Sequence, residues 1–190
     1  MNVELSKLLH DDRSAYVLEG YGGKGIAQWP FFYFIRQFFD DDEVKAKNRW
    51  VDWLIDQHSK YGSFEKKNGG MYGGSVQKYA LDIAGCKSPA DLTDADIKHG
   101  AISLVERRIA MMRSIRDEGF NAKKNGRVIA LKVLRDKKIY YVMKGGHHRA
   151  AVLFALGYAS FPNVLVVAPT TYKFLHFGRK VVNSIRKRIL

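Results

Sequence analysis

The 190-residue sequence predicts a mixed α+β fold, in which a helical N-terminal part precedes a small mixed sheet with flanking helices. Three observations predict it. Apolar and aromatic residues recur at helical spacing through much of residues 1–95. Two β-branched and aromatic runs, separated by a polar turn, then give the pattern of a hairpin. A glycine pair opens one more helical run, which leads into a final apolar strand.

The N-terminal part, residues 1–95, is expected to be a helical extension. Pro30 suits the first turn of a helix through "FFYFIRQFF", which would end near the acidic run 40–43. A second helix is expected to follow and to end before Gly62. Its predicted inward face consists of Val44, Lys47, Val51, Leu54 and His58, with Trp50 and Trp53 on the flanks.

Two glycine-rich stretches interrupt this part of the chain. "GYGGKG" (residues 20–25) lacks the spacing of a phosphate-binding P-loop. "KKNGGMYGGS" (residues 66–75) is either an ordinary connector or a loop that closes over a substrate, with lysines that attract anions and a serine that donates a hydrogen bond. The residues of this predicted substrate loop are Lys66, Lys67, Gly69, Gly70, Tyr72 and Ser75.

The middle part, residues 96–171, is expected to form the domain that carries the chemistry. Val105, Ile109 and Met112 recur at helical spacing in "LVERRIAMMRSIRDEGF", and Gly119 stands where a helix C-cap is expected. "VIALKVL" and "IYYVMK" then predict a hairpin. "GGHHRAAVLFALGY" predicts a helix closed by Gly157, and "FPNVLVV" predicts a buried strand.

The residues between the hairpin and its following helix predict a phosphate site. Glycines let the backbone approach a ligand, and the first N–H groups of a helix point outward at its positive end. Arg149 could fork onto phosphate oxygens, and histidines could donate hydrogen bonds. The predicted nucleotide-binding residues are Lys144, Gly145, Gly146, His147, His148 and Arg149. The alternative is an ordinary strand-to-helix turn with a surface histidine pair.

Over roughly residues 104–167 the sequence resembles the ParB/sulfiredoxin superfamily. The motifs "SIRDEGF", "VIALKVL", "IYYVMK", "GGHHRAA", "ALGY" and "FPNVLVV" stand in the order of that fold. Sulfiredoxins have Gly-Gly-Cys-His-Arg at the loop, so His147 replaces their nucleophilic cysteine and excludes sulfinic acid reduction. The loop also resembles the Asp-Gly-His-His-Arg of free serine kinases, although Gly145 replaces their aspartate.

The resemblance to those kinases implies an ATP-dependent phosphotransferase that uses Mg²⁺ and acts on a small-molecule or glycan hydroxyl. The expected catalytic residues are Glu106 and His148. Glu106 is the chosen substitute for the missing aspartate, ahead of Asp94 and Asp96. The alternatives are that Glu106 belongs to a solvated helix face and that the site is a nucleotide sensor without phosphoryl transfer. No metal site made of protein ligands is expected, because His58 and His99 are isolated.

The charge is concentrated toward the C-terminus. The net charge is +13, and no Asp or Glu follows Asp136, whereas ten Lys or Arg do. Residues 172–190 predict a basic amphipathic helix that either lies in an anionic membrane interface, which we favour, or packs its apolar face onto the domain. Its apolar side would contain Phe174, Leu175, Val181, Val182, Ile185 and Ile189, opposite Arg179, Lys180, Arg186 and Lys187.

A ParB-like, nucleotide-dependent DNA-binding protein is the rival function, because a basic C-terminal part suits nucleic acid. Two features count against it: only about twenty residues follow the last predicted strand, which is too short for a helix-turn-helix domain, and the loop has two histidines where ParB proteins have Glu-Arg or Arg-Arg. A single cysteine, Cys86, and an N-terminus without a signal-peptide pattern predict a cytoplasmic protein. The basic tail favours a peripheral position on the inner face of the membrane.

Overall fold

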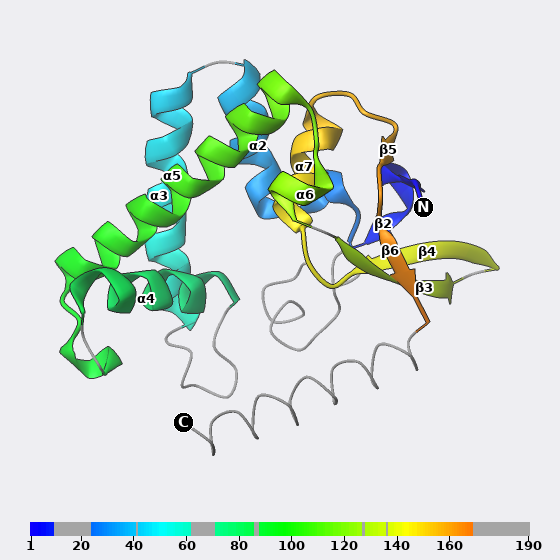
Figure 1. Ribbon diagram of the computed structural model, residues 1–190. Coiled ribbons are helices and arrows are strands. Elements are labelled where there is room, and N and C mark those ends of the chain that lie inside the picture. The colour runs from blue at the N-terminus through cyan, green and yellow to red at the C-terminus, as the bar shows by residue number, and fades with distance from the viewer. Residues whose placement is uncertain are drawn as a thin grey trace.

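The structure is a computed structural model that describes residues 1–9, 24–40, 42–61, 71–85, 88–126, 128–135 and 137–168. It has the mixed α+β architecture that the sequence predicts, with helices gathered on one side of small sheets (Figure 1). The helices are α2 (Pro30–Asp40), α3 (Glu43–Tyr61), α4 (Met71–Ala84), α5 (Asp94–Glu118), α6 (Ala122–Asn125) and α7 (His147–Ala155). Short 3-10 turns occupy Leu5–Lys7, Ile26–Gln28 and Pro89–Asp91. The predicted basic tail, 172–190, lies outside the described residues.

The main sheet has four strands in the order β2 (Leu8–Leu9), β4 (Lys138–Met143), β3 (Ile129–Arg135) and β6 (Leu165–Val167). The predicted hairpin is confirmed, since β3 and β4 are antiparallel with Leu131 opposite Val142. Strand β2 runs parallel to β4, and β6 runs parallel to β3. A second, two-stranded sheet pairs β1 (Val3–Glu4) with β5 (Ser160–Phe161). The N-terminal part is therefore not purely helical, because it supplies β1 and β2.

The predicted helix 30–40 is confirmed, and the predicted inward face of the next helix is right in part. Val51 and Leu54 are buried on α3 as expected, but Val44 is 67% exposed, and Trp50, expected on the flank, is fully buried. The burial of Trp50 removes much more apolar surface from water than burial of Val44 would, so the large aromatic ring determines which side of the helix faces the core.

Helix α5 is longer than the expected one because a capping box starts it at Asp94. The hydroxyl of Thr93 accepts a hydrogen bond from the backbone N–H of Asp96, and the Asp96 carboxylate accepts one from the backbone N–H of Thr93. The predicted C-cap is confirmed: Gly119 follows the helix with a φ of 76°, and its N–H donates to the carbonyl of Ile115.

The glycine-rich stretch 66–75 is not simply a loop. Its second half begins helix α4 at Met71, so Tyr72 and Ser75 lie on a helix. The first half, with Lys66, Lys67, Gly69 and Gly70, lies outside the described residues. Helix α4 packs on α3 and α5.

"FPNVLVV" is not one buried strand. Phe161 ends β5, Asn163 turns the chain with a φ of 57°, and Leu165 begins β6 at the edge of the main sheet with 47% of its surface exposed. An edge strand has a neighbour on one side only, which explains the exposure of Leu165.

One main core joins both halves of the chain. Its buried residues run from Val3 in β1 through Phe31, Trp50 and Val105 to Val164, so the expected boundary near residue 95 does not separate two cores. A smaller cluster of Leu9, Leu131 and Val142 lies apart from the main core, on strands of the main sheet. Among the described residues, no helix is long and apolar enough to cross a membrane.

Candidate functional site

The candidate site is the GGHHR loop, our name for residues 145–149. Gly145 and Gly146 join β4 to α7, and His147, His148 and Arg149 lie in the first turn of α7. Gly146 is the N-cap of α7 and has a φ of 82° and a ψ of 16°, in the left-handed region. A Cβ atom on Gly146 would lie 2.4 Å from Cγ2 of Val128, at the start of β3. The glycine is therefore required for backbone conformation and for close approach to a side chain. Gly145 has open space around its Cα, so no such packing requires it.

Lys144 anchors the loop to the sheet. Its backbone N–H donates to the carbonyl of Ile129 at 2.9 Å, which continues the hairpin ladder to the edge of the GGHHR loop. The first turn of α7 then closes when the N–H of Ala150 donates to the carbonyl of Gly146 at 3.0 Å. The loop is thus held at both ends by backbone hydrogen bonds.

Arg149 is a half-buried cation at the site. Its Nη1 donates to the carbonyl of Gly126 at 2.6 Å. Among the described residues, no carboxylate forms an ion pair with Arg149. Burial lowers the pKa of its guanidinium, because water that would solvate the charge is excluded.

The two histidine rings of the loop pack among aromatic side chains. His147 is buried, and its ring lies edge-on to Trp29 with centroids 5.5 Å apart. The His148 ring lies 4.2 Å from the ring of Phe31 and 6.0 Å from that of Trp50. The rings therefore bind the loop to α2 and α3, and the expected contribution of these side chains to phosphate binding stays a prediction.

Arg108 extends this packing from α5. Its guanidinium carbon lies 5.1 Å from the centroid of the Trp50 ring, within reach of a cation–π interaction. Arg108, Trp50 and His148 thus form a continuous contact from α5 through α3 to the start of α7.

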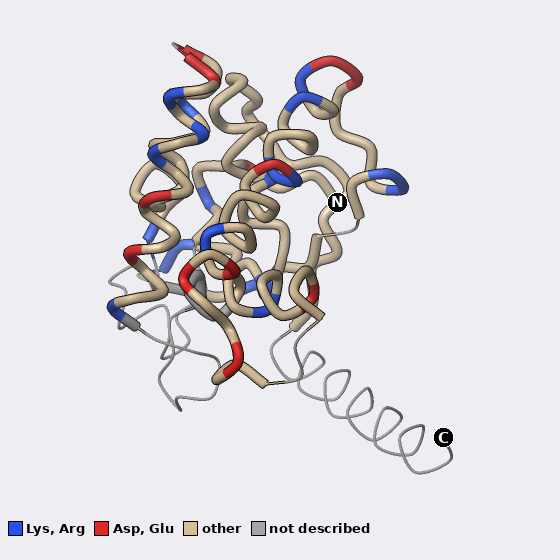
Figure 2. The backbone as a smooth tube through the Cα atoms, turned by 90° about the vertical axis from the view of Figure 1, so that its left-hand side faces the viewer, with Lys and Arg blue, Asp and Glu red and all other residues tan. Residues whose placement is uncertain are grey.

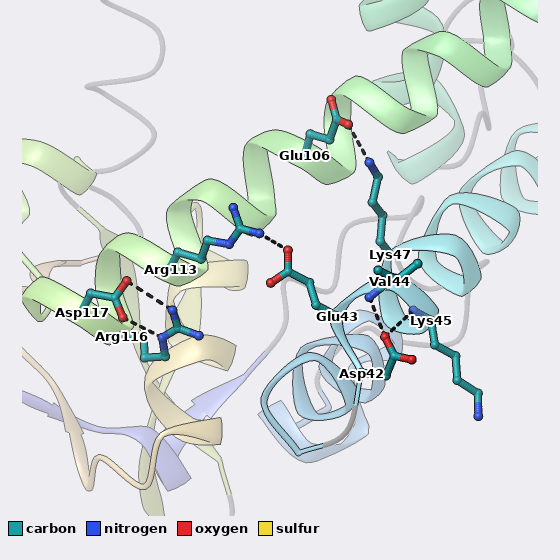
Figure 3. Close-up of polar contacts among 9 residues, drawn as sticks. All are labelled: Asp42, Glu43, Val44, Lys45, Lys47, Glu106, Arg113, Arg116 and Asp117. Carbon is teal, nitrogen blue, oxygen red and sulfur yellow. Dashed lines mark hydrogen bonds and ion pairs between the residues drawn. The ribbon is translucent and has the colours of Figure 1, made fainter.

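The predicted base, Glu106, lies elsewhere on α5. Figure 3 shows its carboxylate directed at Lys47 of α3, with an Nζ to Oε1 distance of 2.6 Å. Residues two apart on a helix point to different sides, so Glu106 does not share the face on which Arg108 meets Trp50. The structure consequently does not bring Glu106 together with the GGHHR loop. Of the weaker candidates, Asp94 lies in the first turn of α5 and Asp96 serves as its cap.

A cavity of about 730 Å³ has no residue of the GGHHR loop in its lining. It is lined by Met1, Phe120, Asn121, Ala122, Lys123, Asn163, Val164 and Leu165. The cavity and the loop share neighbouring supports, since the N–H of Leu165 in the lining donates to the carbonyl of Val128, which packs against Gly146. No sequence pattern indicated this cavity, because its walls come from segments at least forty residues apart.

Within the described ranges, no group of three His, Cys, Asp or Glu residues is placed to hold a metal ion. Acidic and basic residues are interspersed along the helices of this part of the chain (Figure 2). The excess of positive charge in the sequence lies mainly after Asp136, where ten Lys or Arg and no Asp or Glu occur.

Sequence reasoning missed the residues that support the loop from other elements. Val128 and Gly126 lie just before β3, and Phe31 and Trp50 lie more than ninety residues before the loop. A local signal near these residues is the Asn125-Gly126 pair, which is typical of a turn but does not indicate which side chain the turn contacts.

Comparisons with known proteins found no match: no family model, curated protein or solved structure is similar to this chain.

Proposed function

We propose that the chain is an ATP-dependent phosphotransferase of the ParB/sulfiredoxin class that acts on a hydroxyl of a small molecule or glycan. The observation that carries the proposal is Arg149, a half-buried guanidinium without a carboxylate partner among the described residues. A desolvated cation in that state gains most from an anionic ligand. Its position in the first turn of α7 adds the positive end of a nine-residue helix.

The order of elements supports the assignment to this class. Helix α5, the β3–β4 hairpin, helix α7 and the final strand β6 follow one another in the order that the motif resemblance predicts, with α6 and β5 as additional elements. Gly146 supports it further, because the glycine closest to α7 adopts the left-handed conformation that turns the backbone into the helix.

In the proposed reaction, the backbone N–H groups at the start of α7 and the remaining donors of Arg149 bind the phosphates of ATP. Bound with the nucleotide, Mg²⁺ would supply positive charge to offset the negative charge of the phosphates. The acceptor hydroxyl must lose a proton to a base, the role proposed for Glu106, which must first leave Lys47 and come closer to the loop, with His148 as a second catalytic residue. The acceptor is proposed to reach the site past residues 66–75, which carry Lys66 and Lys67.

The ion pair between Glu106 and Lys47 favours a second candidate function, that of a nucleotide sensor without phosphoryl transfer. A carboxylate that is paired with Lys47 of α3, away from the GGHHR loop, must change partner and position before it can serve as a base. Gly145 also stands where the similar kinases have an aspartate.

Calorimetry with ATP, CTP and GTP tests nucleotide binding. Arg149→Ala is expected to weaken binding by about 1.5–3 kcal/mol, the cost of a lost charged hydrogen bond. Arg113→Ala is the matched control, because Arg113 is an exposed arginine paired with Glu43 on the helical side of the molecule (Figure 3). If Arg149→Ala, Arg113→Ala and the unaltered chain bind nucleotide with the same affinity, or if none binds any nucleotide, the assignment of the nucleotide site to the GGHHR loop is wrong.

Phosphorus NMR separates the kinase from the sensor. The unaltered chain is incubated with Mg·ATP, pooled polar metabolites and lipid-linked sugars, and new phosphoesters are followed. Glu106→Gln is expected to lower turnover more than nucleotide affinity, whereas Lys47→Met, which releases the carboxylate, preserves turnover. His147→Cys is expected to create no sulfinic acid reductase. Nucleotide binding without any phosphoester would establish the sensor.

The proposed partner of residues 172–190 is an anionic membrane surface, which would place the protein at the cytoplasmic face of a membrane. The six basic residues of this segment would each contribute about 1 kcal/mol near such a surface. DNA is the less favoured partner, because phosphate contacts alone would leave the apolar side of the tail unused.

A further inference from the structure

The main sheet is apolar on both faces. Along β3, Ala130 belongs to the main core, whereas Leu131 belongs to the separate small cluster. Neighbouring residues of a strand point to opposite faces, so the two clusters lie on opposite sides of the sheet. A sheet of this kind needs a hydrophobic partner on each side.

The register makes the second face continuous. Leu9 of β2 pairs with Val142 of β4, Val142 pairs with Leu131 of β3, and Leu131 pairs with Val167 of β6. These residues form one apolar row across all four strands, and Val133 and Tyr140 extend it toward the hairpin turn. We call these six residues the second face. Leu9, Leu131 and Val142 are buried, although the hydrophobic neighbours of this cluster among the described residues all lie on the strands themselves.

We propose that the C-terminal segment 172–190 docks its apolar side on the second face. The six apolar residues of that side recur at helical spacing over sixteen positions, which matches an apolar row that crosses the whole sheet. The basic residues would then point to solvent, where their charges stay hydrated.

The connection allows this docking. The segment follows directly on β6, whose Val167 belongs to the second face. Five residue steps lead from Val167 to Tyr172 and reach at most about 17 Å. Four strands spaced at about 4.8 Å span about 14 Å from the first to the last. A helix over residues 172–190 would be about 28 Å long and would therefore cover the width of the sheet.

The chemistry of the occupant favours this segment over the chain between Leu9 and Gly25. That stretch carries Asp11, Asp12, Arg13 and Glu19 and has a single short apolar run, "YVL". Burial of that stretch on an apolar face would remove its charges from water, which is costly. It also lacks the long apolar side that the C-terminal segment would place on the sheet.

Cysteine cross-linking in the full chain tests the proposal. In a Cys86→Ser background, Val182→Cys is combined with either Val133→Cys or Leu134→Cys. The two strand positions are neighbours, but Leu134 lies on the opposite face and is 75% exposed. Docking predicts an intrachain disulfide that forms on the order of tenfold faster with Val133→Cys, because the docked segment raises the effective concentration on one face only.

Three results would overturn the proposal. Equal rates for the two strand positions would mean that the segment has no preferred face. Disulfides formed only between two molecules would assign the second face to another copy of the chain. Hydrogen exchange of the unaltered chain provides a test without substitutions: amides 174–189 are expected to be protected, and exchange at the rate of an unfolded peptide would exclude docking.

Discussion

Gly146 combines two constraints at one residue, a left-handed backbone and contact with Val128. Gly157, at the other end of α7, has a similar φ of 79°, but open space surrounds its Cα. The two glycines differ only in the second constraint, so they separate the cost of backbone strain from that of a clash.

Gly146→Ala is expected to lower the free energy of unfolding by about 2–5 kcal/mol, the sum of left-handed strain and overpacking. Gly157→Ala is expected to cost about 1–2 kcal/mol, from the strain alone. Urea denaturation followed by circular dichroism measures both. Equal losses would show that Val128 moves aside at little cost.

His58 couples the stability of α3 to pH. Burial lowers the pKa of its imidazole, and its Nδ1 has no hydrogen-bond partner among the described residues. The unfolded chain therefore takes up the proton more readily than the folded chain. At a pH above the pKa of His58 in the unfolded chain, about 6.5, this histidine does not lower the free energy of unfolding. Below that pH the unfolded chain is protonated first, so the free energy of unfolding falls.

Replacement of His58 by Asn is expected to reduce the fall in melting temperature between pH 7.5 and pH 5.5. His99→Asn serves as the control, because His99 is exposed on α5. Thermal melts at both pH values check the difference. A fall of unchanged size in the His58 variant would mean that other groups cause the acid sensitivity.

At the scale of elements, α4 and α5 cross at Gly100. A Cβ atom there would lie 2.7 Å from the backbone nitrogen of Ala80 and 2.7 Å from the carbonyl oxygen of Val76. Backbone atoms of a helix cannot turn aside as a flexible side chain can. The glycine therefore sets the distance between the two helices.

Gly100→Ala is expected to destabilise the chain by about 1–3 kcal/mol, although alanine is the better helix former by about 1 kcal/mol. The clash outweighs the helix propensity because two backbone atoms must move. Ser103→Ala in the same helix is the control, with an expected change within about 0.5 kcal/mol. Stabilisation by Gly100→Ala, measured by urea denaturation, would show that the helices separate easily.

The ion pairs between α3 and α5 contribute less. Lys47 with Glu106 and Arg113 with Glu43 join exposed or half-exposed side chains (Figure 3). Pairs of this kind are worth about 0–1 kcal/mol each. The packing of Trp50 and Leu54 between these helices outweighs them, so Glu106 can exchange its partner at small cost to the fold.

At the scale of the whole molecule, the C-terminal segment has two proposed partners that need the same apolar side. A membrane and the second face of the sheet would therefore compete for it, and we expect an anionic membrane to draw it away from the sheet.

The full chain is expected to co-sediment with vesicles that contain anionic lipid, and binding should persist in part at high salt because apolar burial is not screened. Val133→Asp, which weakens the second face, should increase vesicle binding, whereas Leu134→Asp on the opposite face should not. Duplex DNA in a gel shift is the comparison. Salt-resistant DNA binding without vesicle binding would favour the ParB-like function.

Local patterns by themselves determined several parts of the fold. Pro30, Gly119 and Gly157 mark the ends of helices, and two β-branched runs around a polar turn form the hairpin, because these signals act within a few residues. The candidate loop was also visible in the sequence, since the pattern of a strand, two glycines and a helix is local.

The tertiary structure alone decided which residues meet the loop. The sequence placed Trp50 only on the flank of the buried face of α3, because its contacts with His148 and Arg108 come from distant segments. The position of Glu106 depended on its angle around α5 and on Lys47, neither of which a motif specifies. The second face of the sheet required the register of four strands. Periodicity indicates that a side chain is buried, but only packing between distant segments determines its neighbours.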